Sequence, residues 1–543
     1  MSLSTNSIDW AISHLEKVGD SDLFPRPVEL DAVLALKDDV KSRLTSLDLS
    51  KCLPSPARRF IVPKDDLSVR QATQLNLLDS IILTSIIHEC GSLIEQRRRA
   101  TSENRVFSYR FKPDNDGWLY DRNFDWTPFW ANCYDNSKQY SHALVLDISD
   151  FYNQIYHHTI ENQLIQSGLP NQYTQWIKKL LESLTAKVSR GIPVGPHATH
   201  LLAEATLIPV DNSLVSQGVN FCRFVDDFVI FANSEDEARA YLYRFSDTLD
   251  KQQRLILNKQ KTRLLSSSEL QSYCKKMIED RPINHLERQL LGIVKKYSGG
   301  NPYQIVRLSQ ITEDDLKSFS KRALELILNE YLLKENNPVE KILMLFKSFA
   351  YRLLSPSPMP DSSKSVNFIR LRWFLRRLTQ IGHPGAIDFC LKNLNHLIPS
   401  LADVCHYLSA ASVNYEGDCV ELGERLLKAL SNEVVSSNEY FQLCVLSLFA
   451  RNSSFNHFSQ LVRLFDNSSG VVRREIIISA RNNNGADWLR ELKETYPSMD
   501  IWCKQAFLVS AKGLVIEERK FFAQSITANS ILDEILLKWL KMP

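Results

Sequence analysis

The stretch NFCRFVDDFVIFA (residues 220–232) sets two adjacent aspartates, Asp226 and Asp227, inside a run of apolar and aromatic residues. Such β-branched and aromatic composition favours strands. Aspartate is unfavourable inside a strand, and burying a carboxylate is costly unless a cation meets it. The pattern therefore predicts two short strands joined by a hairpin whose tip exposes both acids. A plain Asp–Asp turn, common in any protein, is the alternative.

A second strand signal also ends on an acid. The stretch ALVLDI (residues 143–148) is short and apolar, and it carries Asp147 at its C-terminal end, about 80 residues before Asp227. Carboxylates, water and substrate phosphates are the oxygen ligands that Mg²⁺ takes. Two metal ions held in this way activate a 3′-hydroxyl and stabilise a leaving pyrophosphate. We therefore expect the two acidic sites to converge in one sheet as a candidate metal-dependent nucleotidyl-transfer site.

Two weaker signals lie on either side of the acidic pair. The stretch GIPVGP (residues 191–196) has two glycines and two prolines, which predict a rigid turn that opens a helix from about His197 to Ile208. Downstream, LNKQKT (residues 257–262) brings lysines within reach of the predicted sheet. Neither pattern is specific when it is taken alone.

In this order, the four segments resemble the motifs of the reverse transcriptase family. The Asp147 segment looks like the first palm motif, and residues 191–199 look like the second, with Thr199 where a serine is usual. The FVDD stretch (residues 224–227) looks like the Y-x-D-D signature with phenylalanine in place of tyrosine. The LNKQKT stretch looks like the motif that follows it.

A basic stretch further upstream extends this resemblance. RRFIVPK (residues 58–64) and Arg70 resemble the basic fingers segment of bacterial family members. The resemblance covers about residues 55–270. It implies the fingers and palm of a right-hand polymerase, hence an α+β fold over residues 1–285 with the palm core at about 141–265.

The resemblance also implies the metal ligands. Asp147, Asp226 and Asp227 would be the catalytic acids, and together with the backbone carbonyl of Ile148 they would hold two Mg²⁺ ions, with Mn²⁺ as a possible substitute.

Other positions that match the family motifs would bind the nucleotide. Tyr152 matches the aromatic residue that blocks a 2′-hydroxyl, so deoxynucleotides should be preferred. Cations near a triphosphate neutralise charge as it develops. The remaining nucleotide-binding candidates are Lys64 and Arg70 for the triphosphate, Gly195 and Pro196 for close backbone approach, and Lys261 for the leaving pyrophosphate.

Within the family, the second motif and the C-terminal half of the chain indicate one subgroup. GIPVGP and the helix after it resemble bacterial abortive-infection enzymes of the AbiK/AbiA group, and the length looks closest to their prophage-encoded member. This likeness implies phage defence, template-independent synthesis primed by the protein, a single-stranded DNA product attached to it, and a homo-oligomer built through the helical domain. Candidate priming side chains are Tyr109, Tyr120, Tyr134 and Tyr140.

The second half of the chain reads as helices. Apolar residues recur at three- and four-residue spacing from about residue 310 onward, with short connections that contain Gly, Pro, Asn or Ser. We therefore predict an all-helical domain over residues 286–543, of HEAT-like repeats or, alternatively, an ordinary helical bundle. The stretch 355–365, with three prolines and five serines, predicts an exposed connection.

The composition excludes several classes of protein. With 543 residues, 44% hydrophobic and 24% charged residues and a net charge of +2, the chain is neither disordered nor uniformly basic. Residues 251–300 are the exception, with a local net charge of +7, which indicates a phosphate-binding segment or a solvated helix face. The scattered cysteines and the absence of a signal or membrane-spanning pattern predict a cytoplasmic protein without a membrane partner.

Two other functions remain open from the residues themselves. The three aspartates indicate nucleotidyl transfer but do not say whether a template is used, so a template-dependent enzyme of the retron type is an alternative. A non-catalytic helical scaffold on a vestigial polymerase is the other, although a vestigial site has no reason to keep buried acids.

Overall fold

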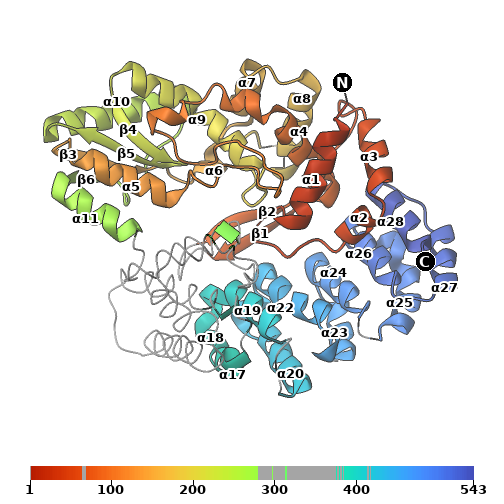
Figure 1. The fold of residues 1–543 in the computed structure, drawn as a ribbon. Helices are drawn as coiled ribbons and strands as arrows, with labels where there is room; N and C mark the ends of the chain where they lie inside the picture. The colour runs from red at the N-terminus through yellow and green to blue at the C-terminus, as the bar shows by residue number, and fades with distance from the viewer. Residues whose placement is uncertain are drawn as a thin grey trace. The chain divides into compact units, whose positions relative to one another are not determined.

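The computed structural model describes residues 2–278, except 22, 64–68 and 187, and residues 384–543, except 413–414, 416, 456 and 483. Between these ranges it describes residues 296–297, 312, 314, 375, 378–379 and 382. The chain forms two compact units (Figure 1). The first contains residues 1–26, 37–59 and 72–282, and the second contains residues 27–36, 60–71 and 283–543.

A four-stranded antiparallel sheet forms the centre of the first unit, in the order β4-β5-β3-β6. Strand β3 pairs with β5 in a register that sets Asp147 opposite Asp227. The two strand segments predicted from the sequence are confirmed, and the hairpin tip falls on Val225 and Asp226. The strand bounds are β3 His142–Asp147, β4 Asn220–Phe224, β5 Asp227–Ala232 and β6 Arg263–Ser266.

Helices cover both faces of this sheet. Helices α5 (Trp126–Ser137) and α11 (Ser267–Ile278) pack on one face, and α9 (Thr199–Ser216) and α10 (Glu235–Gln253) pack on the other (Figure 1). The core below α5 and α11 contains every second residue of the central strands: Ala143 and Val145 on β3, and Val229 and Phe231 on β5. Because side chains alternate along a strand, Asp147 and Asp227 belong to this same face, at its end.

Helix α9 is longer than the sequence predicted. It begins at Thr199, near the expected start, but continues to Ser216 rather than ending near Ile208, so the predicted end is wrong. Pro209 lies inside the helix and lacks an N–H donor, which usually ends a helix. Here most of the helix is buried, and tertiary packing outweighs the local cost.

The other helices of the first unit pack mainly on one another and on α9. Among them, α4 is long and apolar enough to cross a membrane by composition, with a mean hydropathy of 1.5, but 78% of that window is buried against the rest of the protein. It is therefore a core helix, packed on α1 and α9. The bounds are α1 Thr5–Lys17, α3 Lys37–Thr45, α4 Leu77–Glu95, α6 Phe151–Gln154, α7 His157–Gln166 and α8 Asn171–Leu184.

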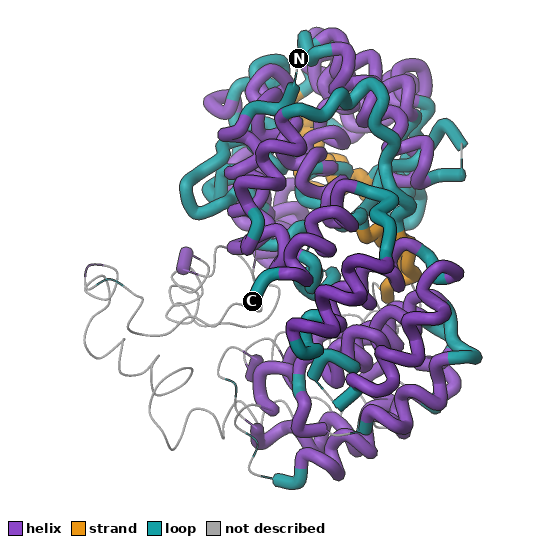
Figure 2. The backbone as a smooth tube through the Cα atoms, turned by 90° about the vertical axis from the view of Figure 1, so that its right-hand side faces the viewer, coloured by secondary structure: helices purple, strands orange, loops and turns teal. Residues whose placement is uncertain are grey.

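Beyond residue 384, the described chain consists of helices and loops (Figure 2). Successive helices pack pairwise, α19 on α22, α22 on α24, α24 on α26 and α26 on α28. The mostly helical character predicted for this half is confirmed, whereas HEAT-like repetition stays a prediction. The bounds are α17 Ile387–Lys392, α18 Leu394–Leu397, α19 Leu401–Ala411, α20 Cys419–Leu430, α21 Glu433–Ser436, α22 Glu439–Arg451, α23 Phe458–Phe465, α24 Gly470–Ser479, α25 Ala486–Leu492, α26 Ile501–Ala511, α27 Ile516–Ser525 and α28 Ile531–Lys541.

The second unit also includes a short piece of the N-terminal region. Helix α2 (Leu30–Ala35) packs on α28, and the buried Glu29 just before it accepts two hydrogen bonds from Arg474 of α24, at 2.8 and 3.0 Å. The predicted connection at 355–365 lies outside the described residues. All ten cysteines are described as free thiols, and all but Cys52 and Cys419 are buried.

Candidate active site

The three predicted catalytic acids come from the ends of neighbouring strands. Asp147 is the last residue of β3 and only 5% exposed, and Asp227 is the first residue of β5 directly opposite it. Asp226 lies in the turn between β4 and β5, and its carbonyl accepts a hydrogen bond from the Ile148 amide at 3.1 Å. The pairing of β3 with the hairpin therefore brings the three aspartates to one end of the sheet.

The hairpin tip holds an unusual backbone conformation. Val225 has φ +55°, a left-handed value that is rare for a β-branched residue. Its N–H donates to the Ser108 hydroxyl at 2.9 Å, and its carbonyl accepts from the Arg223 guanidinium at 3.3 Å. The two contacts hold the strained residue from both sides, as expected where a backbone outlier serves a site.

A network of buried charges lies behind this tip. Arg223 is fully buried and pairs with Asp211 at 2.7 Å and Glu204 at 2.8 Å, both on α9. Burial by itself would lower the pKa of Arg223, but the two carboxylates outweigh it and raise the pKa above its ordinary value. Glu204 also accepts from the Ser108 hydroxyl at 2.5 Å and from Arg98 at 2.7 Å. Every hydrogen bond to the Val225 backbone thus leads back to α9.

A lysine is the cation that contacts Asp147 in this structure. The Lys261 ammonium lies 2.6 Å from Asp147 Oδ2, and its side chain is 51% exposed. Burial opposes its charge, yet the hydrogen bond to Asp147 and the negative charges of Asp227 and Asp226 raise the pKa of Lys261. The ammonium therefore lies at the end of the sheet where Asp147 and Asp227 face each other. The Asn258 amide, donating to the Asp147 carbonyl at 2.8 Å, holds the 257–262 turn against β3.

These acids fit a pair of hard divalent cations by their chemistry. Carboxylate oxygens are the preferred ligands of Mg²⁺, and the ammonium of Lys261 shows that this end of the sheet accepts positive charge. Within the described ranges, no group of three or more His, Cys, Asp or Glu side chains is already arranged as a metal cage. Asp147, Asp226, Asp227 and the Ile148 carbonyl are the residues that would hold such ions.

Tyr152 lies next to these acids on the short helix α6. It is half-buried, and its hydroxyl is 2.6 Å from Nδ1 of His200 on α9. Burial raises the pKa of Tyr152 well above its ordinary value, and the nearby charge of Asp226 adds to the rise. Tyr152, which we call the gate residue because it is predicted to block a 2′-hydroxyl, therefore stays a neutral phenol near Asp226.

The 191–196 turn packs closely on the C-terminal end of strand β2 (Val69–Gln74). The Thr73 amide donates to the Val194 carbonyl at 2.8 Å. Gly195 has φ +130°, and a Cβ there would lie 3.1 Å from the Thr73 carbonyl oxygen, so a side chain would be strained and crowded. The close backbone approach that the structure describes at Gly195 is thus to β2. At the other end of the turn, the Thr199 hydroxyl donates within hydrogen-bond distance of the Pro196 carbonyl, at 2.7 Å.

The two predicted triphosphate ligands differ in what the structure describes. Arg70 is exposed on β2, three residues before Thr73, and β2 pairs with β1 (Arg58–Pro63). Lys64 lies outside the described residues. A role for either in binding triphosphate stays a prediction.

The four candidate priming tyrosines divide into two pairs. Tyr134 and Tyr140 pack against the core cluster on the α5 face of the sheet. Tyr109 stacks on His200 with ring centroids 4.0 Å apart, and Tyr120 donates its hydroxyl to the His197 carbonyl at 2.6 Å. Only the second pair adjoins the residues around Tyr152.

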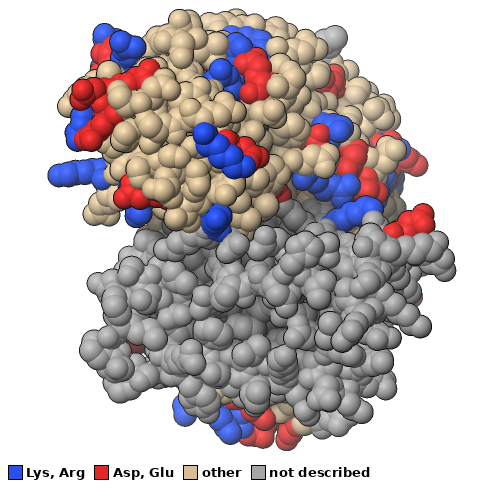
Figure 3. Space-filling model, turned by 60° about the vertical axis from the view of Figure 1, so that its left-hand side comes forward, with Lys and Arg blue, Asp and Glu red and all other residues tan. Residues whose placement is uncertain are grey.

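The basic segment 251–300 is described in part. Lys251 and Arg254 make exposed pairs with acids on the same helix, at 2.8 and 3.4 Å, and Lys261 pairs with Asp147. On the face shown in Figure 3, basic side chains of the described residues lie among acidic ones. A phosphate-binding role for the segment stays a prediction.

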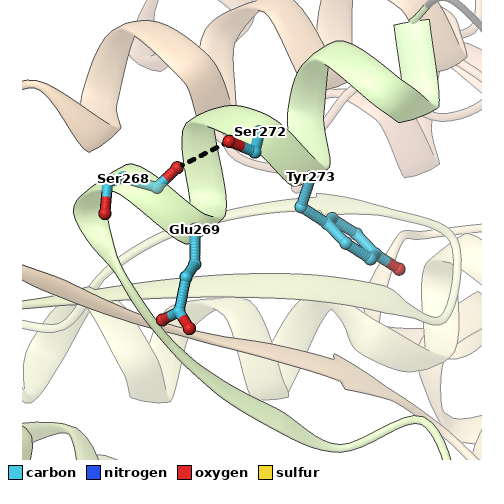
Figure 4. A pocket seen from close by; sticks show the side chains of 4 residues that line it. All are labelled: Ser268, Glu269, Ser272 and Tyr273. Atoms are coloured by element: carbon cyan, nitrogen blue, oxygen red, sulfur yellow. Dashed lines mark hydrogen bonds between the residues drawn. The ribbon is translucent and has the colours of Figure 1, made fainter.

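A pocket of ≈ 390 Å³ lies along α11. Figure 4 shows Glu269 and Tyr273 pointing to the same side of this helix, while the Ser272 hydroxyl donates to the Ser268 carbonyl at 3.0 Å. The Glu269 carboxylate accepts from the Ser266 hydroxyl at 2.7 Å. The side chains of Glu269 and Ser272 therefore already form hydrogen bonds with the helix and the strand before it.

Sequence reasoning missed the residues that support the acids. Arg223 stands in an apolar strand, two residues after Phe221, and a lone arginine there is a signal that could have indicated a buried ion pair. Glu204 and His200 recur four residues apart in an otherwise apolar helix, which could have indicated a shared polar face. Ser108 carries no signal of its own.

Comparison with known families agrees with this geometry. Residues 62–294 match the model of the family described as reverse transcriptase (RNA-dependent DNA polymerase). The matched range contains the sheet, the hairpin and the three aspartates. No curated protein matches the chain. This part of the chain is therefore similar to reverse transcriptases, a family of nucleotidyl-transferring polymerases.

Proposed function

We propose that the reverse transcriptase-like domain of this chain is a DNA polymerase that adds deoxynucleotides to a growing 3′ end. The observation that carries the proposal is the convergence of Asp147, Asp226 and Asp227 at one end of the sheet, where the Lys261 ammonium contacts Asp147. Divalent ions bound there would supply activation of the 3′-hydroxyl and charge stabilisation of the leaving pyrophosphate.

The protein's own residues would orient the nucleotide. Tyr152 would exclude a 2′-hydroxyl, and Arg70 and Lys64 would neutralise the triphosphate. The backbone of Gly195 and Pro196 would lie beside the nucleotide. Lys261 would leave Asp147 when a metal ion binds and would then be available to the pyrophosphate, since its half-exposed side chain is long and flexible.

We further propose an abortive-infection role, with synthesis that is primed by the protein and needs no template. The likeness of the palm motifs to that group supports this proposal, as does the mostly helical chain after residue 384. The DNA product would then be attached to a side chain, and the helical domain would build a homo-oligomer. Tyr109 is a priming candidate beside Tyr152 and His200.

The experiment uses purified full-length protein, Mg²⁺ and labelled dNTPs, with no template or primer. Products are separated on a denaturing gel before and after protease treatment. The Asp226→Asn/Asp227→Asn double variant is the control for the site, and Asp236→Asn, an exposed acid on α10, is the control for loss of a surface carboxylate.

Each outcome selects one function. Label that shifts with protease and disappears in the double variant supports protein-primed, template-free synthesis at these acids. Label that appears only with a primed RNA template contradicts template independence and favours a template-copying enzyme. A lack of label under both conditions contradicts the polymerase itself and leaves a helical scaffold.

A further inference from the structure

We propose that His200 is a positioning residue that fixes the ring of Tyr152 and thereby sets the preference for deoxynucleotides over ribonucleotides. This inference rests on the proposed function, in which Tyr152 excludes a 2′-hydroxyl. It adds a second residue to that gate, contributed by a different element, helix α9.

The contact between the two side chains is close and directional. The Tyr152 hydroxyl lies 2.6 Å from His200 Nδ1, and the two rings meet edge to face with centroids 5.8 Å apart at an interplanar angle of 88°. The backbone alone would leave the Tyr152 side chain free to change rotamer. The hydrogen bond to its hydroxyl holds the ring in one of these rotamers. The position of the gate thus depends on the imidazole.

His200 is itself held by a third ring. Its imidazole stacks on Tyr109 with centroids 4.0 Å apart and planes at 4°. Tyr109 has φ +44°, a strained value for an aromatic residue, and its carbonyl accepts from Arg98 at 2.7 Å. A strained residue persists only where its surroundings hold it, and such residues concentrate at functional sites. The rings of Tyr109, His200 and Tyr152 thus contact one another in a row, stacked at the first contact and edge to face at the second. We call this row of rings the gate stack.

The gate stack is joined to the carboxylate hairpin through α9. Glu204 lies one turn after His200 on the same helix face and binds Ser108, the neighbour of Tyr109. Ser108 in turn accepts the Val225 amide at the hairpin tip. One helix therefore sets both the gate ring and the turn that carries Asp226.

The chemistry of the stack favours a stable neutral hydrogen bond. Burial, with a smaller effect from His197, lowers the pKa of His200 to about 3, so the imidazole is uncharged at neutral pH. Burial keeps the Tyr152 phenol protonated. Because both partners are uncharged, their hydrogen bond persists over the whole pH range in which a polymerase works.

A purely structural His200 would contribute packing alone. Its removal would then lower stability without changing which sugar is selected. A positioning residue predicts a change in the ratio of deoxynucleotide to ribonucleotide use, because only the ribonucleotide has the 2′-hydroxyl that the ring meets. The two roles are separated by this ratio.

The test measures discrimination in four single variants, His200→Ala, His200→Asn, Tyr152→Phe and Tyr152→Ala, and in the double variant His200→Ala/Tyr152→Phe. Asparagine retains an acceptor near the position of Nδ1, and phenylalanine keeps the ring but loses the hydroxyl. His158→Ala, which removes an exposed imidazole from α7, is the matched control. The ratio of dATP to ATP is measured both as kcat/KM for incorporation and as Kd by calorimetry, and folding is checked by circular dichroism.

We expect His200→Ala to lower the dATP/ATP ratio about fivefold, as for the loss of one neutral hydrogen bond, through a fall in the KM for ATP. Tyr152→Phe should show the same fall, and the double variant His200→Ala/Tyr152→Phe should fall no further, because both changes remove one contact. His200→Asn should restore most of the ratio.

Two results would overturn the inference, and they are distinguishable. An unchanged ratio in His200→Ala, with a lowered ratio in Tyr152→Ala, would leave the gate intact and remove His200 from it. An unchanged ratio in Tyr152→Ala would remove the gate and the inference together. A lack of dATP incorporation by the wild type would contradict the proposed function, and the ratio of Kd values would then decide the role of His200.

Discussion

The two units each bury an arginine between two acids, but they use it for different purposes. Arg223 of the reverse transcriptase-like unit binds Asp211 and Glu204, and Arg474 of the helical unit binds Glu29 and Glu475. Both side chains are at most 5% exposed. The chemistry of the two triads is the same, so any difference must come from the backbone that each one holds.

The Arg223 triad supports a local conformation, and the Arg474 triad joins distant segments. Arg223 donates to the carbonyl of the strained Val225, beside Asp226. Arg474 holds Glu29, which is 445 residues away in sequence. The role of a buried ion pair therefore depends on its neighbours. The Arg223 pairs support the geometry of a site, and the Arg474 pairs join two parts of the chain into one unit.

Removing each arginine should give the largest effects. Arg223→Met leaves the buried Asp211 without its arginine, and Arg474→Met does the same to Glu29 and Glu475. Each loss costs about 3–5 kcal/mol of unfolding free energy. Hydrogen exchange should locate the loss at residues 105–111 and 220–232 for Arg223→Met, and at residues 27–36 and 470–480 for Arg474→Met. The same exposed segments in both variants would contradict the division between a local and an assembling role.

The strained tip should tolerate glycine better than a regular strand does. Val225→Gly loses a buried side chain but relieves a left-handed conformation, whereas Val229→Gly loses a similar side chain from the middle of β5 and gains nothing. We expect Val229→Gly to lower the free energy of unfolding, measured with urea, by about 2 kcal/mol more than Val225→Gly does. Only Val225→Gly relieves strain, and only Val229→Gly places a glycine inside a strand. Equal costs would show that the tip stores no strain.

The smallest expected effect concerns Lys261. Lys261→Met removes the ammonium that contacts Asp147, so Mn²⁺ should bind roughly two- to fivefold more tightly, the size expected when a half-exposed ion pair no longer competes. Binding is measured by electron paramagnetic resonance without nucleotide. Lys251→Met breaks an exposed pair on α10 and is the control, for which no change is expected. Weaker Mn²⁺ binding in Lys261→Met would contradict competition between the ammonium and the metal.

Much of the site was predictable from the sequence because its chemistry needs particular residues. Asp147, Asp226 and Asp227 stand out as acids in apolar strands, and the strand pairing confirms their convergence. The helical character of the second half was predictable from its apolar spacing. The roles of Tyr152, Gly195, Pro196, Arg70 and Lys64, and the division at residue 285, stay predictions.

The support behind the site was not predictable, because it depends on contacts between distant segments. Ser108 joins the Val225 amide to Glu204, 96 residues along the chain. Glu29 is an ordinary acid in sequence until Arg474 packs on it. The end of α9 was mispredicted because Pro209 is a strong local signal that burial overrides. Local patterns carry no information on such pairings.

The central claim is that the three strand-end acids form one catalytic site, and Asp226→Asn tests it most directly. Incorporation of labelled dNTPs is compared between wild type, Asp226→Asn and the surface control Asp236→Asn. Each protein is assayed at the same interval below its own melting temperature. The account predicts a loss of at least about 100-fold in Asp226→Asn alone, since one preorganised charge at the reacting centre is removed. Wild-type incorporation by Asp226→Asn would contradict it.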